Sequence, residues 1–428
     1  MLQRLDLRGI TGPITPHLPR PEVDGDEPVD AVRAILDSVR RDGDAAIRDY
    51  TERFDGVALD DLRVPTEALR AALDATPADV RDALELAHHN VAEYHRHQRP
   101  ADQRYEADGI VVRSLFRPVE RAGCYVPGGR ALYPSTVLMT AVPARVAGVD
   151  QVVLCVPPGP DGLPPEVTMA AAAVAEVDEV YAVGGAQAIA AMAYGTETIA
   201  PVDVIVGPGN IYVAIAKREV AGVVGVPSSF AGPSEVVVIA DGTDPVELAA
   251  IDVVVQAEHG PHGLAWLVTW SPDVADAAAA AVAEIVAASP RRADIEATLA
   301  AAGIVALVDG PEQAMAVANA IAPEHLQLMT ADNEALVAAT RHAGAVFCGP
   351  SAPASFGDYI AGPSHVLPTN GSARFSQSLT TFDFVKDVHV VDIDAEAADR
   401  LAPHVEALAT AEGLAAHAQS ARMRRARQ

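Results

Sequence analysis

From about Gly109 onward, short runs of Val, Ile and Leu alternate with stretches that have the apolar spacing of helices. This alternation is typical of parallel β-sheets covered by helices on both faces, because parallel strands need a crossover connection. The sequence therefore predicts an α/β fold. The expected strands are residues 152–156, 179–183, 202–206, 236–240, 264–269, 304–308, 326–329 and 345–348, and the expected helices include 186–194, 212–220, 245–257 and 274–288.

The two ends of the chain differ from this middle region. Residues 29–41 and 77–98 carry apolar residues at three- and four-residue spacing, so we expect the first hundred residues to be mainly helical. After a strand-like run at 388–393, residues 395–427 are expected to be mostly helix. A tail of this size cannot form its own core, so it must pack on a lobe of its own subunit or on a partner subunit. With 428 residues, the chain is expected to contain at least two lobes.

The composition excludes several classes of partner. A formal net charge of −27 opposes binding to nucleic acid or to an anionic membrane. The two lysines, Lys217 and Lys386, do not lie in a phosphate-binding P-loop motif. Three isolated cysteines favour a reducing compartment, and the sequence has no uncharged apolar run of about 18 residues. We therefore expect a soluble, cytoplasmic protein with no nucleic-acid or membrane partner.

Three glycine-rich turns lie in the middle of the chain, at residues 126–129, 184–187 and 207–210. Glycine at a strand–helix junction lets a cofactor approach the backbone, and helix N-termini favour phosphate. None of the turns matches GxGxxG, so each turn taken singly is better explained as an ordinary turn than as a cofactor site. Together they are as consistent with a nucleotide site as with plain turns, and its polar or stacking contacts would be Tyr125, Gln187 and Asn210.

Two polar clusters in apolar surroundings contain groups suited to catalysis. Glu324 and His325 place a group that can activate water beside one that exchanges a proton near neutral pH, although such a pair can also cap a strand. Gln256 and His259 are three residues apart at the end of an expected helix, hence on one face. They can bind a metal together with other ligands, or His259 can cap the helix terminus.

Further candidates lie in expected loops and on the last helix. Asp358 and His365 lie in segments rich in Gly, Ser and Pro, where a metal or substrate contact and a solvated turn are both possible. Glu412 and His417 are about 140° apart around an expected helix, so they can reach a common site only across a broad cleft. Ser234 lies in a tight turn that lacks the GxSxG pattern of a nucleophilic serine.

Taken in order, these segments form a set of motifs with a recognisable family likeness. The set is Tyr125-Val-Pro-Gly-Gly, Gly184-Gly-Ala-Gln-Ala-Ile-Ala, Gly207-Pro-Gly-Asn, Ala231-Gly-Pro-Ser-Glu, Gln256-Ala-Glu-His, Pro323-Glu-His, Gly357-Asp-Tyr, His365-Val-Leu-Pro-Thr and Glu412-Gly-Leu-x-x-His. It resembles the histidinol dehydrogenase family over essentially the whole chain. The sequence departs from the family at Ser364, where an Asn often precedes the loop histidine, and around Arg130.

The resemblance implies a zinc-dependent, NAD-linked enzyme of histidine biosynthesis that oxidises L-histidinol through L-histidinaldehyde to L-histidine with two NAD per turnover. It implies two incomplete Rossmann-like parallel-sheet lobes and a small helical C-terminal tail, in a homodimer with exchanged tails and shared active sites. The expected domains are an N-terminal arm (1–20), a first α/β lobe with the metal and catalytic residues (21–124 plus 234–380), a second, NAD-binding lobe (125–233) and the tail, which packs on the partner subunit (381–428).

The resemblance also implies residue roles. One Zn²⁺ per subunit would be held by Gln256, His259, Asp358 and His417. Glu324 and His325 would be the catalytic acid/base pair. The substrate would contact these zinc ligands and His325, together with Ser234, His365 and Glu412, and NAD would contact Tyr125, Gln187 and Asn210.

Three other functions are consistent with parts of this pattern. A related zinc- and NAD-dependent dehydrogenase of another polar alcohol, such as a sulfonated diol, would keep the same machinery, but Glu412 and His365 favour histidinol. A zinc hydrolase would use Glu324 to activate water without a redox step, and the glycine-rich turns with Gln187 and Asn210 argue against it. A non-catalytic binding protein would not need the complete set of polar groups.

Overall fold

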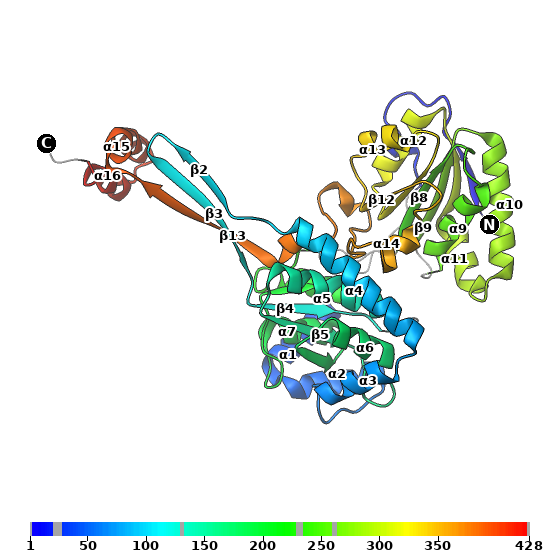
Figure 1. Cartoon of the computed structure of the whole chain (residues 1–428), viewed down its shortest axis with the longest axis horizontal. Helices are drawn as coiled ribbons and strands as arrows, with labels where there is room; N and C mark the ends of the chain where they lie inside the picture. The colour runs from blue at the N-terminus through cyan, green and yellow to red at the C-terminus, as the bar shows by residue number, and fades with distance from the viewer. Residues whose placement is uncertain (1, 20–27, 129–131, 228–233, 259–262, 426–428) are drawn as a thin grey trace.

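The structure is a computed structural model that describes residues 2–19, 28–128, 132–227, 234–258 and 263–425. It consists of two α/β lobes and a long arm that projects away from both of them (Figure 1). Each lobe is built on a parallel sheet, so the fold class predicted from the alternation of apolar runs and helices is confirmed.

The larger lobe contains a six-stranded parallel sheet of order β1-β10-β9-β8-β11-β12. Its strands are β1 (Gln3–Asp6), β8 (Glu235–Ala240), β9 (Leu264–Thr269), β10 (Gly303–Leu307), β11 (His325–Met329) and β12 (Ala345–Cys348). One face is covered by α9 (Val246–Ala257), α10 (Pro272–Ala288) and α11 (Arg292–Ala302). The other face is covered by α12 (Pro311–Ile321) and α13 (Asn333–Ala339), and α14 (Ala354–Tyr359) follows the last strand.

The alternation of side chains along each strand explains why these strands appear in the sequence as uninterrupted apolar runs. Val237 and Ile239 of β8 belong to the core beneath α12, whereas Val236 and Val238 belong to the core beneath α9 and α10. Successive side chains of a strand point to opposite faces, and both faces are buried here. A strand of this kind therefore shows no polar alternation.

The other lobe has the smaller sheet and is called the smaller lobe for that reason. Its sheet is parallel and four-stranded, with the order β6-β5-β4-β7. Its strands are β4 (Arg121–Tyr125), β5 (Gln151–Val156), β6 (Glu179–Ala182) and β7 (Val204–Val206). Its helices are α1 (Val29–Asp42), α2 (Asp44–Asp55), α3 (Thr66–Ala75), α4 (Ala78–Gln98), α5 (Pro134–Ala147), α6 (Glu166–Val174), α7 (Gly185–Tyr194) and α8 (Ile211–Val220).

The N-terminal helices pack on a different lobe from the one predicted. Residues 21–124 were grouped with residues 234–380, but α1 packs on α7 and α8, α3 on α6, and α4 on α5. The apolar faces of α1 to α4 share one core with the smaller sheet. An amphipathic pattern specifies that a helix buries one face but not which surface covers it, so the grouping was wrong. The predicted N-terminal arm (1–20) is also partly integrated, because β1 pairs with β10 at the edge of the larger sheet.

The arm is an antiparallel sheet of order β13-β3-β2, built from β2 (Gln103–Ala107), β3 (Ile110–Pro118) and β13 (Val385–Ile393). It joins two segments far apart in the sequence, so the predicted tail (381–428) is anchored to residues 110–118. At its tip, α15 (Ala395–Ala411) and α16 (Ala415–Arg422) pack on each other (Figure 1). Short 3₁₀-helices are formed by η1 (Thr15–His17), η2 (Ser372–Arg374) and η3 (Thr381–Phe384).

The β2–β3 hairpin was not predicted, although the sequence contains a signal for it. Asp108 and Gly109 join the strands with φ angles of 49° and 74°. Two central residues with positive φ form the tight turn that Asp-Gly favours, because its twist matches the twist of the flanking strands. The Asp-Gly pair is therefore the signal from which the hairpin could have been predicted.

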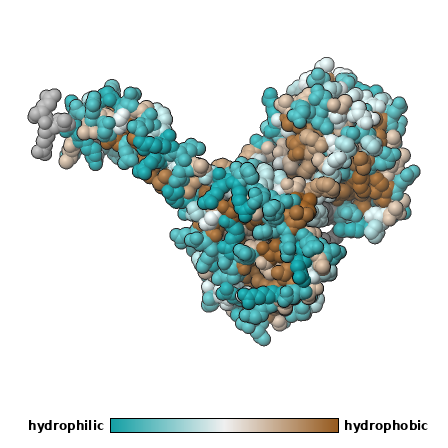
Figure 2. Space-filling model, in the orientation of Figure 1, coloured by the Kyte–Doolittle hydropathy of each residue, from teal (hydrophilic) through white to brown (hydrophobic). Residues whose placement is uncertain are grey.

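The surface of the arm is mostly hydrophilic in Figure 2, but it carries exposed apolar side chains. They include Val388, Val391, Leu408 and Leu414. Such side chains on an arm that extends away from both lobes are available for contact with another chain. Within the described ranges, no helix combines the length and the apolar character needed to cross a bilayer.

Candidate active site

Glu324 and His325 lie at the amino end of the larger sheet, where β11 begins. The preceding helix α12 ends at Ala322 in the left-handed region (φ 56°), and the chain then turns into the sheet. His325 is the first residue of β11 and pairs with Val236 of β8. Both side chains are buried, with exposed fractions of 8% for Glu324 and 3% for His325. The expectation that this pair opens a strand is therefore confirmed, and the strand lies inside the sheet rather than at its edge.

The main chain of Glu235, the first residue of β8, fixes both members of the pair. Its backbone N–H donates to Glu324 Oε2 at 3.0 Å, and its carbonyl oxygen lies 3.2 Å from His325 Nδ1. A carbonyl can only accept, so this contact places a proton on Nδ1. In the neutral ring Nε2 is then the basic nitrogen, and it is the atom that faces Asp358 Oδ1 at 3.1 Å.

Burial and charge act in opposite directions on His325. Burial lowers the pKa of His325, but the carboxylates of Glu324 and Asp358 outweigh burial and raise the pKa to about 10. For the nearby carboxyl of Glu235, burial and the charge of Glu324 raise the pKa to about 7. The site therefore contains one carboxyl group, that of Glu235, and one imidazole, that of His325, with raised pKa values, which is common where proton transfer is catalysed.

Asp358 is positioned beside His325 by the close packing of α14 on Phe347. It was expected in a loop but lies in α14, so that expectation was wrong. The ring of Phe347 on β12 stacks on His325 with the centroids 5.8 Å apart and an interplanar angle of 20°. A Cβ on Gly357 would lie 2.4 Å from the Phe347 ring. Glycine at this position therefore lets α14 approach Phe347, and this approach places the next residue, Asp358, beside His325.

Gln256 reaches the same place from the other side of β8. Helix α9 runs back from the carboxyl end of β8, so its last turn returns to the amino end of the sheet. The amide Nε2 of Gln256 lies 3.3 Å from His325 Nδ1. Its Oε1 is buried and, among the described residues, has no hydrogen-bond partner. An unpartnered buried oxygen next to Asp358 and His325 is suited to a metal ion.

The described residues contain only part of the predicted metal site. His259 lies outside them, and His417 is on the arm. Within the described ranges, no group of three or more His, Cys, Asp and Glu side chains is placed to hold a metal ion. Gln256 and Asp358 are close to the same imidazole, so the residues that are placed fit a shared ligand set.

His365 connects this site to the smaller lobe. Its Nδ1 lies 2.7 Å from the Asp358 carbonyl oxygen, and its Nε2 lies 3.0 Å from Thr136 Oγ1 in the first turn of α5. Burial lowers the pKa of His365 more than the neighbouring carboxylates raise it. The ring is therefore neutral at neutral pH, with a proton on Nδ1 and with Nε2 accepting from the threonine hydroxyl.

Two serines hold the chain on either side of these contacts. The hydroxyl of Ser364 donates to the Met139 carbonyl oxygen of α5 at 2.9 Å, so the residue that departs from the family pattern contacts the smaller lobe. The carbonyl oxygen of Ser234 accepts from the Leu264 N–H at 3.0 Å, which ties Ser234 to the amino end of the larger sheet. Arg130, the other departure, lies outside the described residues.

The three glycine-rich turns meet at the carboxyl end of the smaller sheet. Gly185 donates its backbone N–H to the Tyr125 hydroxyl at 3.0 Å. A Cβ on Gly207 would lie 2.0 Å from the Tyr125 carbonyl oxygen, and Gly207 has a φ of 106°, so only glycine fits there. Gln187 is buried, with an Oε1 that lacks a hydrogen-bond partner among the described residues. Asn210 caps α8 by accepting from the Val213 N–H at 3.2 Å.

Lys217 is a further residue of this region that the sequence pattern did not single out. It is buried in α8, and its ammonium group donates to the Gly207 carbonyl oxygen at 2.5 Å. Burial lowers the pKa of Lys217 to about 8. The sequence signal that could have identified it is a lysine that follows an apolar helical run in a chain with only two lysines.

Glu412 and His417 are not brought to this site within one chain. They were expected on one helix, but Glu412 is the C-cap of α15, Gly413 turns the chain with a φ of 76°, and His417 lies in α16. Both side chains are exposed. They lie at the tip of the arm, far from β8 and β11 (Figure 1). Within one chain they are therefore separated from the Glu324–His325 site.

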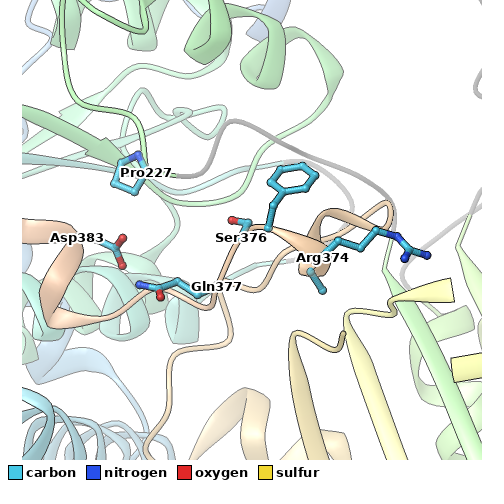
Figure 3. A pocket seen from close by; sticks show the side chains of 7 residues that line it. Pro227, Arg374, Ser376, Gln377 and Asp383 are labelled. Atoms are coloured by element: carbon cyan, nitrogen blue, oxygen red, sulfur yellow. The ribbon is translucent and has the colours of Figure 1, made fainter. Parts of the chain in front are cut away.

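A surface hollow of about 420 Å³ lies beside the segment that follows His365 (Figure 3). It is lined by Pro227, Ala373, Arg374, Phe375, Ser376, Gln377 and Asp383. Arg374 extends away from Pro227 and Asp383, and its guanidinium group donates to the Ala320 carbonyl oxygen. None of the predicted site residues lines this hollow, so it is distinct from the Glu324–His325 site.

The two lobes thus contribute opposite ends of their sheets, with an acid/base pair at the amino end of one and glycine-rich turns at the carboxyl end of the other. This arrangement defines a two-lobed α/β enzyme. The family model described as histidinol dehydrogenase matches residues 18–425. The chain therefore belongs to the histidinol dehydrogenase family, and it is an NAD-linked oxidoreductase of histidine biosynthesis.

Individual relatives agree with this assignment. The chain is 50% identical over 394 residues to histidinol dehydrogenase of Parasynechococcus marenigrum, covering 92% of this chain and 90% of the relative. It is 47% identical over 410 residues to the enzyme of Bordetella parapertussis, covering 94% and 92%. The crystal structure of histidinol dehydrogenase from Elizabethkingia anophelis is 32% identical and covers 99% of this chain and 98% of its own, with a TM-score of 0.94.

Proposed function

We propose that the protein oxidises L-histidinol through L-histidinaldehyde to L-histidine, with two NAD⁺ reduced per turnover and one zinc ion per subunit. The observation that carries this proposal is the convergence of Glu324, His325, Asp358, Gln256 and His365 at one buried place in a chain of this family. A four-electron oxidation of an alcohol needs a base for the alcohol proton and a base for water, and this site contains both.

The proposed zinc ligands are Gln256, His259 and Asp358 of one subunit and His417 of the partner subunit. Gln256, with its unpartnered oxygen, and Asp358, with its carboxylate, both contact the imidazole of His325, which supports this set. Nitrogen and oxygen ligands of this kind suit a borderline cation such as Zn²⁺. When bound, zinc would hold and orient the substrate through its imidazole and amine, and NAD⁺ would supply the hydride acceptor.

His325 is the proposed base for the alcohol proton. Its Nδ1 proton is directed to the Glu235 carbonyl oxygen, which leaves Nε2 as the atom that takes the proton. With Asp358 engaged as a metal ligand, its carboxylate would no longer support the imidazolium, and His325 could then act as a base. The same ring can then exchange protons in both oxidation steps.

Glu324 is the proposed base that activates water for the aldehyde step. Its carboxylate is buried and oriented by the N–H of Glu235 at 3.0 Å, so its geometry does not depend on the substrate. When water attacks the aldehyde carbon, a C–O bond forms and Glu324 takes the proton from the breaking O–H bond. A fixed carboxylate in this position contributes to catalysis through a general-base effect.

Ser234, His365 and Glu412 of the partner subunit are the proposed additional substrate contacts. His365 is neutral and lies between the two lobes, which suits a hydrogen bond to a polar ligand between them. NAD is proposed to bind at the carboxyl end of the smaller sheet, where Tyr125, Gln187 and Asn210 meet around two glycine turns. Ligands of open α/β sheets commonly bind at that end.

We also propose a homodimer in which each arm completes the site of the other subunit. The exposed positions of Glu412 and His417 at the tip of the arm and the exposed apolar side chains along it support this arrangement. A two-fold symmetric exchange would place both tips on partner lobes at once. The free cysteines Cys124, Cys155 and Cys348 and the biosynthetic role support a cytoplasmic location.

The first experiment is to count NADH formed per L-histidinol consumed, with and without a chelator. We expect two NADH for each histidinol, loss of activity on chelation and recovery with zinc. A folded protein that binds zinc and NAD but forms no NADH from histidinol would contradict the proposed substrate, and another polar alcohol such as a sulfonated diol would then be tested. Histidine formation without NADH would contradict the redox chemistry itself.

A further inference from the structure

Glu235 is part of the Ala231-Gly-Pro-Ser-Glu235 motif. The proposed function uses Ser234 and the main chain of Glu235, but it assigns no role to the side chain of Glu235. Glu235 opens β8 and lies beside the start of β11, because β8 and β11 are neighbours in the sheet. Its side chain is buried, with an exposed fraction of 8%. A buried carboxyl group beside another carboxylate costs free energy unless it is hydrogen-bonded, paired with a cation or protonated.

The side chain of Glu235 is held by the segment that follows His365. The backbone N–H groups of Asn370 and Gly371 donate to its carboxyl group, and so does the backbone N–H of Glu324. Asn370 and Gly371 have φ angles of 54° and 72°, so successive N–H groups point in a similar direction and form a concave site for an anion. Glu235 therefore connects the catalytic pair, through its main chain, with the segment that carries His365, through its side chain.

One oxygen of this carboxyl group is left for another partner. Glu235 Oε2 is buried and has no hydrogen-bond partner among the described residues. The charged group that acts on it is the carboxylate of Glu324, and burial together with that charge raises the pKa of Glu235 to about 7. Among the described residues, His325 and Arg374 do not pair with the Glu235 carboxyl group, because His325 contacts Glu324, Asp358 and the Glu235 carbonyl oxygen, and Arg374 donates to the Ala320 carbonyl oxygen. The pKa of Asp252 on α9 is raised by burial alone.

We propose that Glu235 is a positioning residue that also holds a proton for Glu324 during the aldehyde step. This inference rests on the proposed function, since Glu324 acquires a proton only when it activates water. The proton that Glu324 takes from the attacking water passes to the Glu235 carboxylate, and Glu324 returns to its ionised form. Glu235 later loses the proton to solvent, so no oxidant or other reactant is required.

The test compares Glu235→Gln with wild type and with Asp241→Asn. The glutamine keeps an oxygen that can accept from the Asn370 and Gly371 N–H groups, but it cannot carry a charge or an exchangeable acid proton. Asp241 follows the opposite end of the same strand β8, where it accepts from Thr243 and Ala331, so it is a matched acid-to-amide control. Rates are measured separately with L-histidinol and with L-histidinaldehyde, across pH.

We expect Glu235→Gln to slow aldehyde oxidation by about 10-fold or more, and to slow it more than alcohol oxidation. Its rate profile should lack the inflection that we expect for wild type near pH 7. Asp241→Asn should keep the wild-type ratio of the two rates, and Glu235→Asp should restore part of the inflection. If Glu235→Gln keeps both the wild-type ratio and the inflection, Glu235 is only structural and the inference is overturned.

A second readout does not depend on activity. Because the pKa of Glu235 is raised from 4.5 to about 7 in the folded protein, the folded state keeps a proton that the unfolded chain has released. The Tm of wild type should therefore fall relative to Glu235→Gln as pH rises from about 4.5 to about 7, and the difference should be constant outside this window. A flat difference would overturn the inference. If wild type fails to oxidise histidinol, the proposed function fails, while this readout still decides whether Glu235 titrates as inferred.

Discussion

The hydroxyl of Thr136 lies 3.0 Å from Nε2 of His365, and this hydrogen bond joins the two lobes beside the Glu324–His325 site. Thr136 belongs to α5 of the smaller lobe, whereas His365 is held by the Asp358 carbonyl oxygen of the larger lobe. Since Asp358 also contacts His325, a continuous set of contacts leads from the smaller lobe to the catalytic imidazole. The orientation of His365 thus depends on both lobes.

Replacing Thr136 by valine should weaken substrate binding more than it slows chemistry. Valine keeps the shape of threonine but removes the donor, so Nε2 of a buried, neutral His365 loses its partner. Leaving a buried acceptor without a donor costs about 1–3 kcal/mol, which corresponds to a rise in KM for histidinol of roughly 5- to 150-fold. Thr136→Ser keeps the hydroxyl and should remain close to wild type in KM. A fall in kcat with unchanged KM would show that His365 acts in chemistry rather than in binding.

Glu324→Gln should separate the two oxidation steps. The glutamine can still accept from the Glu235 N–H, but it cannot remove a proton from water. We expect the oxidation of added L-histidinaldehyde to fall by about 100-fold or more, because general-base catalysis contributes effects of that size. The oxidation of histidinol to the aldehyde should fall less, since His325 is intact. Equal losses in both steps, measured by stopped-flow formation of NADH, would contradict the assigned role.

Gln256→Met should lower the zinc content of the purified protein. Methionine has a similar length, but its thioether replaces the oxygen that is buried and unpartnered in the described structure. Loss of a hard oxygen ligand weakens Zn²⁺ binding, and metal analysis after dialysis measures the loss directly. Gln327→Met is the matched control, because Gln327 is also a buried glutamine with an unpartnered Oε1 but lies further along β11. Equal zinc contents in the two variants would remove Gln256 from the ligand set.

Lys217→Met should weaken NAD binding without changing the zinc content. The lysine is buried and donates to the carbonyl oxygen of Gly207, so it holds the turn that approaches Tyr125. Removing a buried hydrogen bond from a charged donor costs about 1.5–3 kcal/mol, part of which should appear as a higher KM for NAD. Lys386→Met removes the other lysine, which is exposed on the arm, and serves as the control. An unchanged KM for NAD in Lys217→Met would mean that the Gly207 turn does not contact the cofactor.

Local patterns predicted the elements of the fold more reliably than their assembly. The expected strand 264–269 matches β9, and the expected helix 77–98 matches α4 within one residue, because apolar spacing reports directly on the buried face. The placement of α1 to α4 on the smaller lobe could not be predicted in this way. It depends on which of two apolar surfaces covers a helix, and that information is not present in the periodicity of the helix.

The site shows the same limit. Glu324 and His325 could be paired from the sequence, because they are consecutive residues. Thr136 and Lys217 lie outside the motifs found in the sequence. Their contacts with His365 and Gly207 therefore became visible only in three dimensions. The separation of Glu412 from His417 by the turn at Gly413 was also missed, because the αL glycine was included in one continuous helix.

Mixing two defective chains tests whether the arm completes the site of a partner subunit. Glu324→Gln lacks the base for water but has an intact arm, whereas His417→Ala has an intact pair at β11 but a defective arm tip. If sites are shared, each mixed dimer contains one site with both defects and one site with neither. Random exchange of subunits would then restore about a quarter of wild-type activity, since about half of the dimers are mixed. If each chain completes its own site, every site in the mixture carries one defect, and co-refolding would restore no activity above the level of the separate variants.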